Sequence, residues 1–403
     1  MNNLSNHPYY YYYTIGNQKF STKLFALYAR EKLDDKQIVW HFSNWENALS
    51  KIDITKEPEE SLQDLYLQRA QQLRNEYDYL ILFYSGGHDS NQILETFMLN
   101  NIFLDEILIM TRGNKVIIDK MGIFPEYYEP IKSAIPQAKF YVENFSPKTK
   151  ITIIENMDSL NSKYLESLTK PEIKNLITSC SPGITHRLLP RTKDINSINL
   201  NWTKLHENKK VGHIFGKEKV RILYDDIGYY IVLSDAHVVD HIDLKFLLSK
   251  NNLPNSVELF YIHPNFVKIQ VKQAHILIKN ISKDKISSEK NLILGTREIE
   301  DLYSNFIYKF KYNRLYFDSK HIEIFISNKK IITEEEKKEI LKKSLSDDVT
   351  KYFTFYNETA FNNYKTILNT IESCFFPNKN KKLIIENCHT GIATKKYYVR
   401  YFK

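Results

Sequence analysis

A short glycine-containing segment carries the residue types best suited to chemistry in this chain. From Ser85 to Ser90 the sequence reads SGGHDS. The two glycines, Gly86 and Gly87, permit backbone torsions and close approaches that other residues do not, so several N–H groups can converge on an anion. Ser85 and Ser90 flank the glycines as hydroxyl donors. The segment predicts a phosphate-binding loop.

The carboxylate of Asp89 has two explanations in such a loop. An acidic side chain beside a polyphosphate repels it unless a cation lies between them, and Mg²⁺ bridging provides that cation. Alternatively, Asp89 caps the N-terminus of a following helix, where the helix dipole and unpaired N–H groups favour negative charge. Both roles are compatible, and the sequence leaves them open.

The elements around the loop place it at the edge of a sheet. The continuous apolar run Tyr79–Tyr84 is typical of a parallel strand covered on both faces. A helix is predicted over Asn91–Leu99, with Ile93, Leu94, Phe97 and Met98 inward, and a second strand over Leu104–Met110. In such a βαβ unit the loop lies at the carboxyl edge of the sheet, where open α/β sheets bind ligands.

The loop differs from two commoner phosphate-binding motifs. The chain has no G-x-x-x-x-G-K-[ST] and no G-x-G-x-x-G in this position. The arrangement of strand, SGGHDS and helix instead resembles the PP-loop of the N-type ATP pyrophosphatases, which include asparagine, GMP and NAD synthetases and the tRNA-lysidine enzymes. The resemblance implies a Rossmann-like fold of the HUP type.

The resemblance also implies an activity and a set of site residues. ATP would be cleaved between its α and β phosphates, with pyrophosphate held by Ser85, Gly86, Gly87, His88, Asp89 and Ser90 and with Mg²⁺ on Asp89. Adenine would lie against the ends of the first two parallel strands, at Leu82, Phe83 and Met110. The AMP group passes to a substrate oxygen, and ammonia or an amine then attacks the activated carbon. The family tolerates many residues at the position of His88.

A wider resemblance extends over about Phe20 to His275. KFSTKLFAL, the segment through SGGHDS, GKEKVRI and ELFYIHPNFVKIQVKQAH are similar to asparagine-synthase-like proteins of large phages and viruses. Their later glycine loop commonly ends Lys-Pro-Arg-Ile, whereas this chain has Val220 in place of the proline, a change that alters the stiffness of the loop and not its charge. The resemblance supports the fold more than the substrate.

A second loop gathers three cations. Lys217, Lys219 and Arg221 follow Gly216 directly after the strand-like His213–Phe215. These cations are predicted to form a second phosphate clamp and to act in catalysis. The alternative is an exposed hairpin with solvated lysines.

Other polar pairs allow a functional or a structural interpretation. His237 and His241 stand four residues apart, as two zinc ligands on one helical face would, but the sequence offers no third ligand. Each of the other two pairs either contacts a ligand or has a structural role. The pairs are His237 with His241, Arg187 with Arg191, and Lys272 with His275.

The predicted fold class is α/β, a twisted parallel sheet flanked by helices, with an α+β addition at each end. The expected divisions are residues 1–75, 76–285 and 286–403. The tyrosine run Tyr9–Tyr13 predicts a half-buried strand, with a base-stacking platform as the alternative. The other expected elements are helices over Glu60–Tyr77, Met157–Ser179, Thr333–Leu345 and from Val267, and strands over Lys139–Phe145, Lys148–Glu155, Lys381–Gly391 and Lys395–Lys403. The segment Gly212–Asp226 is expected to contain a strand, a glycine-basic turn and a second strand.

Composition excludes several classes of protein. The 403 residues carry a net charge of +8 with both signs interspersed, unlike a DNA-coating protein. No apolar run approaches the ~18 residues of a membrane span. Three widely spaced cysteines and the absence of an export signal indicate a cytoplasmic protein, in the host cytoplasm if viral. A homo-oligomer and contact with tRNA or a nucleotide stay open.

Three functional hypotheses follow. The first is an ATP-dependent, AMP-forming ligase that activates a carboxylate or base carbonyl, on a small-molecule or nucleic-acid-derived acceptor. It lacks the N-terminal cysteine of a glutaminase, since Asn2 follows Met1. The second is a nucleotide-binding, catalytically silent protein that acts as an interaction or assembly module. The third is a sulfur-transfer relative, which the cysteine pattern disfavours.

Overall fold

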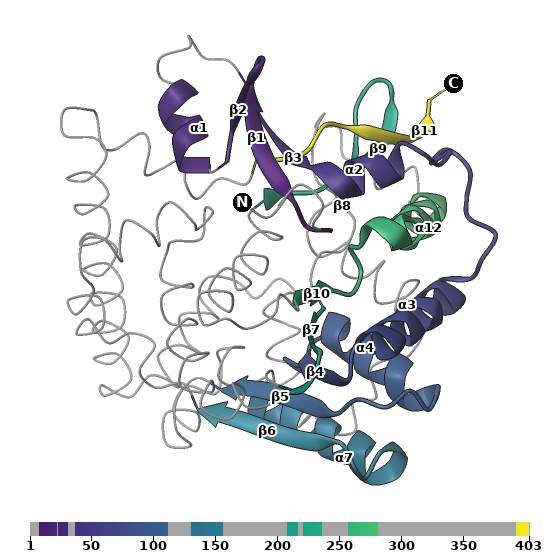
Figure 1. The fold of residues 1–403 in the computed structure, drawn as a ribbon. Helices are drawn as coiled ribbons and strands as arrows, with labels where there is room; N and C mark the ends of the chain where they lie inside the picture. Colours follow the sequence, from purple (N-terminus) through teal and green to yellow (C-terminus); the bar gives the residue numbers. More distant parts are fainter. Residues whose placement is uncertain are drawn as a thin grey trace, which may run out of the picture.

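A parallel sheet of five strands forms the centre of the molecule (Figure 1). The computed structural model describes residues 8–21, 23–30, 37–111, 130–155, 208–216, 221–235, 257–280 and 392–402. The sheet has the order β10-β7-β4-β5-β6, and every neighbouring pair is parallel. Its strands are β4 (Tyr79–Phe83), β5 (Glu106–Thr111), β6 (Lys150–Glu155), β7 (Val211–Phe215) and β10 (Val257–Leu259).

The strand order reverses beside β4. From β4 the chain adds β5 and β6 on one side, and it then returns to add β7 and β10 on the other side. The connections that leave the carboxyl ends of β4 and β7 therefore start beside each other and run in different directions. In open α/β sheets this position is the usual place for a ligand.

Helices pack against the sheet, as expected for an α/β fold. They are α3 (Leu62–Glu76), α4 (His88–Leu99) and α7 (Ile135–Phe145), the last preceded by the π-helical turn η2 (Pro130–Ala134). A capping box fixes the start of α3, since Ser61 accepts from the Asp64 N–H and Asp64 accepts from the Ser61 N–H. The four apolar side chains of α4 predicted to face inward are all buried. The predicted helix over Glu60–Tyr77 and the first βαβ unit are confirmed.

One predicted strand is wrong. Lys139–Phe145 belongs to helix α7, not to a strand. Its aromatic and β-branched residues are typical of strands, but Ile135, Ala138 and Tyr141 recur every three residues and pack inward on one helical face. Pro136 in the first turn is also compatible with a helix start. Tertiary packing on α4 therefore outweighs the local preference.

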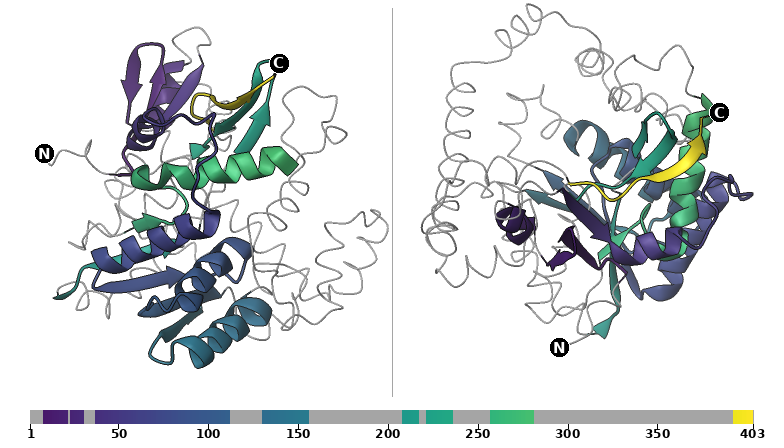
Figure 2. Two further views of the ribbon diagram at one scale, coloured as in Figure 1. Left: turned by 90° about the vertical axis from the view of Figure 1, so that its right-hand side faces the viewer. Right: turned by 90° about the horizontal axis from the view of Figure 1, so that it is seen from above.

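Two small antiparallel sheets complete the described part of the fold. One has the order β2-β1-β3 and the other β11-β9-β8. β1 contains most of the tyrosine run, and its alternate burial confirms the prediction of a half-buried strand. Helix α12 lies between these sheets and the parallel sheet (Figure 2), and it begins at Val267 as predicted. The bounds are β1 (Tyr11–Ile15), β2 (Gln18–Phe20), α1 (Lys23–Arg30), β3 (Ile38–Phe42), α2 (Ser43–Leu49), β8 (Arg221–Tyr224), β9 (Gly228–Val232), η3 (Pro264–Phe266), α12 (Val267–Asn280) and β11 (Tyr397–Tyr401).

One hydrophobic core continues from the N-terminal segment into the parallel sheet and on to β11. It contains Tyr13 and Trp40 from the first sheet, Leu82 from β4 and Tyr397 from β11. β11 pairs with β9, so the last residues return to the middle of the chain. The domain boundaries at residues 75 and 285 stay predictions. The predicted elements over Met157–Ser179, Thr333–Leu345 and Lys381–Gly391 lie outside the described residues.

The length and polarity of the described helices bear on whether they could span a membrane. None of them is both long enough and apolar enough to cross a bilayer.

Candidate functional site

The SGGHDS segment connects β4 to α4 at the carboxyl edge of the parallel sheet, where the strand order reverses (Figure 1). β4 ends at Phe83 and α4 begins at His88. The segment thus has the strand-loop-helix context that the sequence predicted.

The loop requires a glycine at position 86. Gly86 has φ of +80°, in the left-handed region that side-chained residues rarely adopt. A Cβ atom there would also lie 2.7 Å from the backbone nitrogen of Ala134 in η2. The π-helical turn is therefore packed directly against the loop. Turns of this kind frequently occur at functional sites.

Hydroxyl groups and backbone N–H groups converge inside the loop. The Oγ atoms of Ser85 and Ser90 lie 3.2 Å apart, and the Gly87 N–H donates to Ser85 Oγ at 3.3 Å. Gly87 is the N-cap of α4 and offers no side-chain acceptor to the helix. An anion with several oxygens suits this end of the helix, because the axial dipole and the first N–H groups both favour it.

Asp89 occupies the first turn of α4 with a half-buried side chain. Its backbone carbonyl accepts a hydrogen bond of 2.8 Å from the hydroxyl of Tyr261, just after β10. The N-cap is Gly87, so the alternative that Asp89 is the N-cap residue is wrong in its strict form. His88 begins α4, and its side chain lies outside the described residues.

The second predicted loop starts beside the first. A Cβ atom at Gly216 would lie 3.1 Å from both the carbonyl carbon of Asp89 and the nitrogen of Ser90. Lys217 and Lys219 lie outside the described residues. Arg221 is the first residue of β8, and its side chain is likewise outside.

The hairpin part of the alternative for this second loop is wrong, and the exposure of its lysines lies outside the described residues. β7 belongs to the parallel sheet and pairs with β4 and β10, whereas β8 pairs with β9 in an antiparallel sheet. The two strands that flank residues 216–220 are therefore not partners. The connection crosses from one sheet to another, starting at the carboxyl edge where the glycine loop lies.

The residues predicted to contact adenine have unequal exposure. Leu82 is completely buried in the core, so its side chain is not open to a ligand. Phe83 is half-buried and stacks on Phe215 with ring centroids 4.2 Å apart, at the ends of β4 and β7. Met110 is half-buried near the end of β5. Of the three, only Phe83 and Met110 have partly exposed side chains.

A network of buried polar side chains connects the loop to η2 and α7. Ser133 Oγ donates to the Gly86 carbonyl at 3.0 Å, and Gln137 Nε2 donates to Ser133 Oγ at 2.8 Å. The Tyr84 hydroxyl lies 3.1 Å from Gln137 Oε1 and 2.9 Å from Asn91 Oδ1. All of these side chains are buried. The sequence reasoning missed Ser133 and Gln137, which have no distinctive local pattern.

The chain of polar groups ends at a buried carboxyl group. Glu95 Oε1 accepts from Asn91 at 2.9 Å and from the Tyr141 hydroxyl at 2.6 Å. Burial raises the pKa of Glu95 to about 7, against these two hydrogen bonds, which lower it. Its protonation therefore changes near neutral pH.

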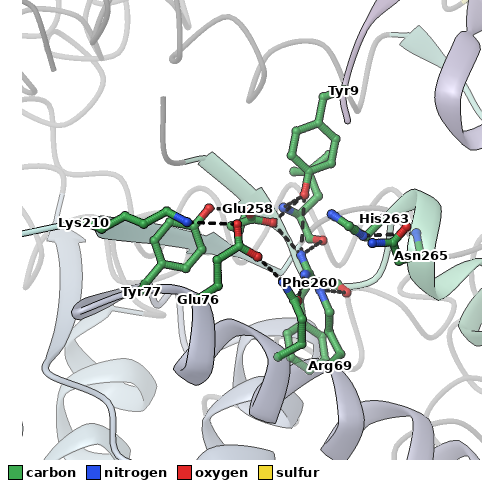
Figure 3. Close-up of polar contacts among 11 residues, drawn as sticks. Tyr9, Arg69, Glu76, Tyr77, Lys210, Glu258, Phe260, His263 and Asn265 are labelled. Atoms are coloured by element: carbon green, nitrogen blue, oxygen red, sulfur yellow. Dashed lines mark hydrogen bonds and ion pairs between the residues drawn. The ribbon is translucent and has the colours of Figure 1, made fainter. Parts of the chain in front are cut away.

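A second polar cluster, built around Arg69, has a different character (Figure 3). Arg69 from α3 is fully buried and pairs with Glu258 of β10 at 2.7 Å. Tyr9 and Tyr77 both donate to the same carboxylate. Burial alone would raise the pKa of Glu258, but the charge of Arg69 and the hydrogen bonds from Tyr77 and Arg69 hold that pKa below its ordinary value.

Arg69 makes further hydrogen bonds within this cluster. Its guanidinium also donates to the backbone carbonyls of Leu259 and Phe260 and to Gln72. The groups thus bind one another and connect the N-terminal segment, α3 and β10. This arrangement is structural, since burial protects it and its charges are paired.

The pair Lys272 and His275 and the ring of Tyr12 all make contacts within the protein. Lys272 donates to the carbonyl of Pro58 at 2.8 Å, and a ring nitrogen of His275 lies 3.0 Å from the carbonyl of Ile54, so both secure the segment before α3. Tyr12 lies between Lys19 Nζ, 3.8 Å from its ring centroid, and the stacked ring of His41. Both contacts disfavour the base-stacking alternative. Arg187, Arg191, His237 and His241 lie outside the described residues.

The oxygen groups of the loop fit a magnesium ion that also binds phosphate. Mg²⁺ is commonly held by one or two carboxylates together with substrate phosphates and water. The half-buried carboxylate of Asp89 is a ligand of that kind. Within the described ranges no group of three or more histidine, cysteine, aspartate or glutamate side chains could form an all-protein metal site.

Comparison with known proteins adds no family assignment. No protein-family model and no curated protein sequence matches the chain.

Proposed function

We propose that this chain is a PP-loop protein that binds Mg-ATP at residues 85–90 and cleaves it to AMP and pyrophosphate. The observation that carries the proposal is the position of the SGGHDS loop. It follows the central strand at the point where the sheet order reverses, and it contains a glycine at φ +80°. The proposal includes the finer fold assignment, a sheet of the HUP type.

In this proposal the loop holds the two terminal phosphates. The N–H groups at the start of α4 and the exposed hydroxyl of Ser85 donate to phosphate oxygens, while the buried Ser90 hydroxyl donates to the Gly87 carbonyl and holds the loop in shape. The second loop begins against Asp89 and Ser90 at Gly216. Its cations, Lys217, Lys219 and Arg221, are proposed to stabilise the charge that develops on the leaving pyrophosphate.

Asp89 would hold the magnesium ion. When bound, the ion neutralises phosphate charge and helps to orient the triphosphate. The protein itself must hold the acceptor oxygen in line with the α phosphate. Phe83 and Met110, at the ends of β4 and β5, are proposed to border the nucleoside.

The proposed overall reaction is acyl or carbonyl activation followed by attack of an amine. A carboxylate or base-carbonyl oxygen attacks the α phosphorus, and the bond from that phosphorus to the bridging oxygen breaks. Pyrophosphate leaves with the electron pair. Ammonia or an amine then displaces AMP from the activated carbon. The acceptor is proposed to be a small molecule or a group derived from a nucleic acid.

Product analysis tests this proposal. Purified full-length protein is incubated with ATP labelled at the α phosphate, Mg²⁺, ammonium and a panel of carboxylic acids and nucleosides. The proposal predicts labelled AMP together with pyrophosphate. Production of ADP would contradict it. Binding of ATP without turnover of any acceptor would instead support the nucleotide-binding, non-catalytic role.

A further inference from the structure

The peptide between Gly86 and Gly87 is the part of the loop with the greatest conformational freedom. Both residues lack a side chain, and a glycine tolerates positive and negative φ almost equally. A rotation of this peptide would reverse its C=O and N–H groups while leaving the flanking strand and helix in place. The contacts that the N–H and the C=O of this peptide make must therefore select one orientation.

The observed orientation has donors on one side and an external contact on the other. No described peptide bond is cis, so the C=O of Gly86 and the N–H of Gly87 point in opposite directions. The N–H points to Ser85 Oγ, which lies beside Ser90 Oγ. The C=O points away from these two hydroxyl groups, toward Ser133 in η2.

Ser133 is well placed to fix this orientation. It is completely buried, and its Oγ accepts a hydrogen bond from Gln137 Nε2. Because Gln137 occupies an acceptor position of this hydroxyl, the Ser133 proton is directed to the Gly86 carbonyl, 3.0 Å away. Gln137 in turn is held by the hydroxyl of Tyr84.

We propose that Ser133 is a positioning residue for the phosphate loop: its hydroxyl holds the Gly86 carbonyl so that the Gly87 N–H faces the bound phosphate. The inference rests on the proposed phosphate-binding function of the loop. With the hydroxyl removed, a flipped peptide would present a carbonyl oxygen to the anion. The oxygen repels phosphate, so the affinity for pyrophosphate falls.

Calorimetric titration with inorganic pyrophosphate and Mg²⁺ measures this effect on the full-length protein. Ser133→Ala is expected to weaken binding about three- to tenfold, the range for loss of one ordinary hydrogen bond. The matched control is Thr149→Val. Thr149 is also buried and donates its hydroxyl to a backbone carbonyl, that of Leu104, but at the opposite edge of the sheet.

The Gly87→Ala background distinguishes positioning from a general loss of stability. Gly87 has φ of −78°, which alanine adopts without strain, whereas the flipped peptide requires a positive φ there. Ser133→Ala should therefore weaken binding by less than twofold when Gly87 is already alanine. If Ser133→Ala does not fold, Ser133→Cys keeps the size of the side chain with a weaker donor.

The outcomes separate the two proposals. If the wild-type protein binds no pyrophosphate and no ATP, the proposed function fails. If it binds and Ser133→Ala binds equally well, only the positioning role is overturned. It is also overturned if Ser133→Ala and Thr149→Val lose equal affinity for pyrophosphate. The same holds if Ser133→Ala weakens binding equally whether residue 87 is glycine or alanine.

Discussion

The Arg69 cluster and the glycine loop are both polar, yet they use polarity in opposite ways. In the Arg69 cluster, the carboxylate of Glu258 receives bonds from three side chains and is almost completely buried. In the glycine loop, Ser85 is exposed and the side chain of Asp89 is half-buried. One cluster is closed by its own partners, and the other has exposed groups at the edge of the sheet.

The two regions therefore differ in what their polar groups are available to bind. The Arg69 cluster holds a buried ion pair, but its groups already bind one another and hold three segments together. The loop is supported on its inner side by η2 and α7 and exposed in part on its other side. We therefore expect changes in the Arg69 cluster to act on stability, and changes in the loop to act on binding and turnover.

The largest effect is expected from Arg69→Met. Methionine retains an unbranched apolar stem but leaves the buried Glu258 carboxylate without its cation, which typically costs 3–5 kcal/mol, so a loss of about that size is expected. Urea denaturation measures it. Lys210→Met is the control, because the pair of Lys210 with Glu76 is exposed and should contribute only about 0–1 kcal/mol. Comparable losses in both variants would contradict the distinction.

Asp89→Asn tests the loop side of the comparison. Loss of the carboxylate should reduce AMP formation about 10²–10³-fold, the size expected when one group that stabilises transition-state charge is removed. The free energy of unfolding should change by less than about 1 kcal/mol, because the side chain is half-buried. The assay compares product rates at saturating ATP and Mg²⁺. Unchanged turnover would exclude Asp89 from the reaction.

Gly86→Ala should affect stability and binding together. The new methyl group would meet the backbone of Ala134, and alanine is strained at φ +80°. A destabilisation of about 1–3 kcal/mol is expected from strain and overlap. Thermal melting with and without pyrophosphate measures both properties. If the variant melts like the wild type and is stabilised equally by pyrophosphate, the packing of η2 on the loop is not as described.

Glu95→Gln sharpens the comparison through pH. The folded pKa of about 7 lies above the ordinary value of 4.5, so the folded protein holds more protons on Glu95 than the unfolded chain does between these values. The protonated Glu95 contributes its full stabilisation below about pH 4.5. This stabilisation is lost as the pH rises through the folded pKa of about 7. Glutamine does not titrate, and the variant should gain about 2–3 kcal/mol relative to wild type between about pH 5 and about pH 8.

Chemical denaturation at several pH values checks this expectation. A difference between the two proteins that does not change with pH would show that the pKa of Glu95 is not raised.

Tyr261→Phe should have the smallest effect. It removes the hydroxyl that bonds the Asp89 carbonyl and leaves the buried ring in place. The expected loss of stability is about 0.5–1.5 kcal/mol. Pyrophosphate affinity should fall by less than in Ser133→Ala, because the bond holds the first turn of α4 and not the glycine peptide. A larger loss of affinity than in Ser133→Ala would reverse this order.

Much of the parallel sheet could be predicted because its signals are local. The apolar run of β4, the helical spacing of α4 and the glycine loop between them are contiguous in the sequence. The strand predicted over Lys139–Phe145 failed because aromatic residues favour strands locally, while packing against α4 decided the actual structure.

The remaining features depend on contacts between distant residues. β11 pairs with β9 although more than 150 residues separate them. Likewise, Ser133 and Tyr261 reach the loop from 47 and 172 residues away. A serine before a helix and a tyrosine after a strand are common, so neither stands out in the sequence. The cations of the second loop were singled out by spacing, and only Gly216 at its start can be placed against the first loop.

The central claim is that residues 85–90 hold the terminal phosphates of a nucleotide. Hydrogen exchange of the full-length protein, measured by mass spectrometry with and without pyrophosphate and Mg²⁺, tests it at the position itself. Bound pyrophosphate should slow exchange in peptides that cover residues 85–92 and the region of Gly216, with no change around β1–β3. Binding without protection of residues 85–92, or protection only elsewhere in the chain, would contradict it.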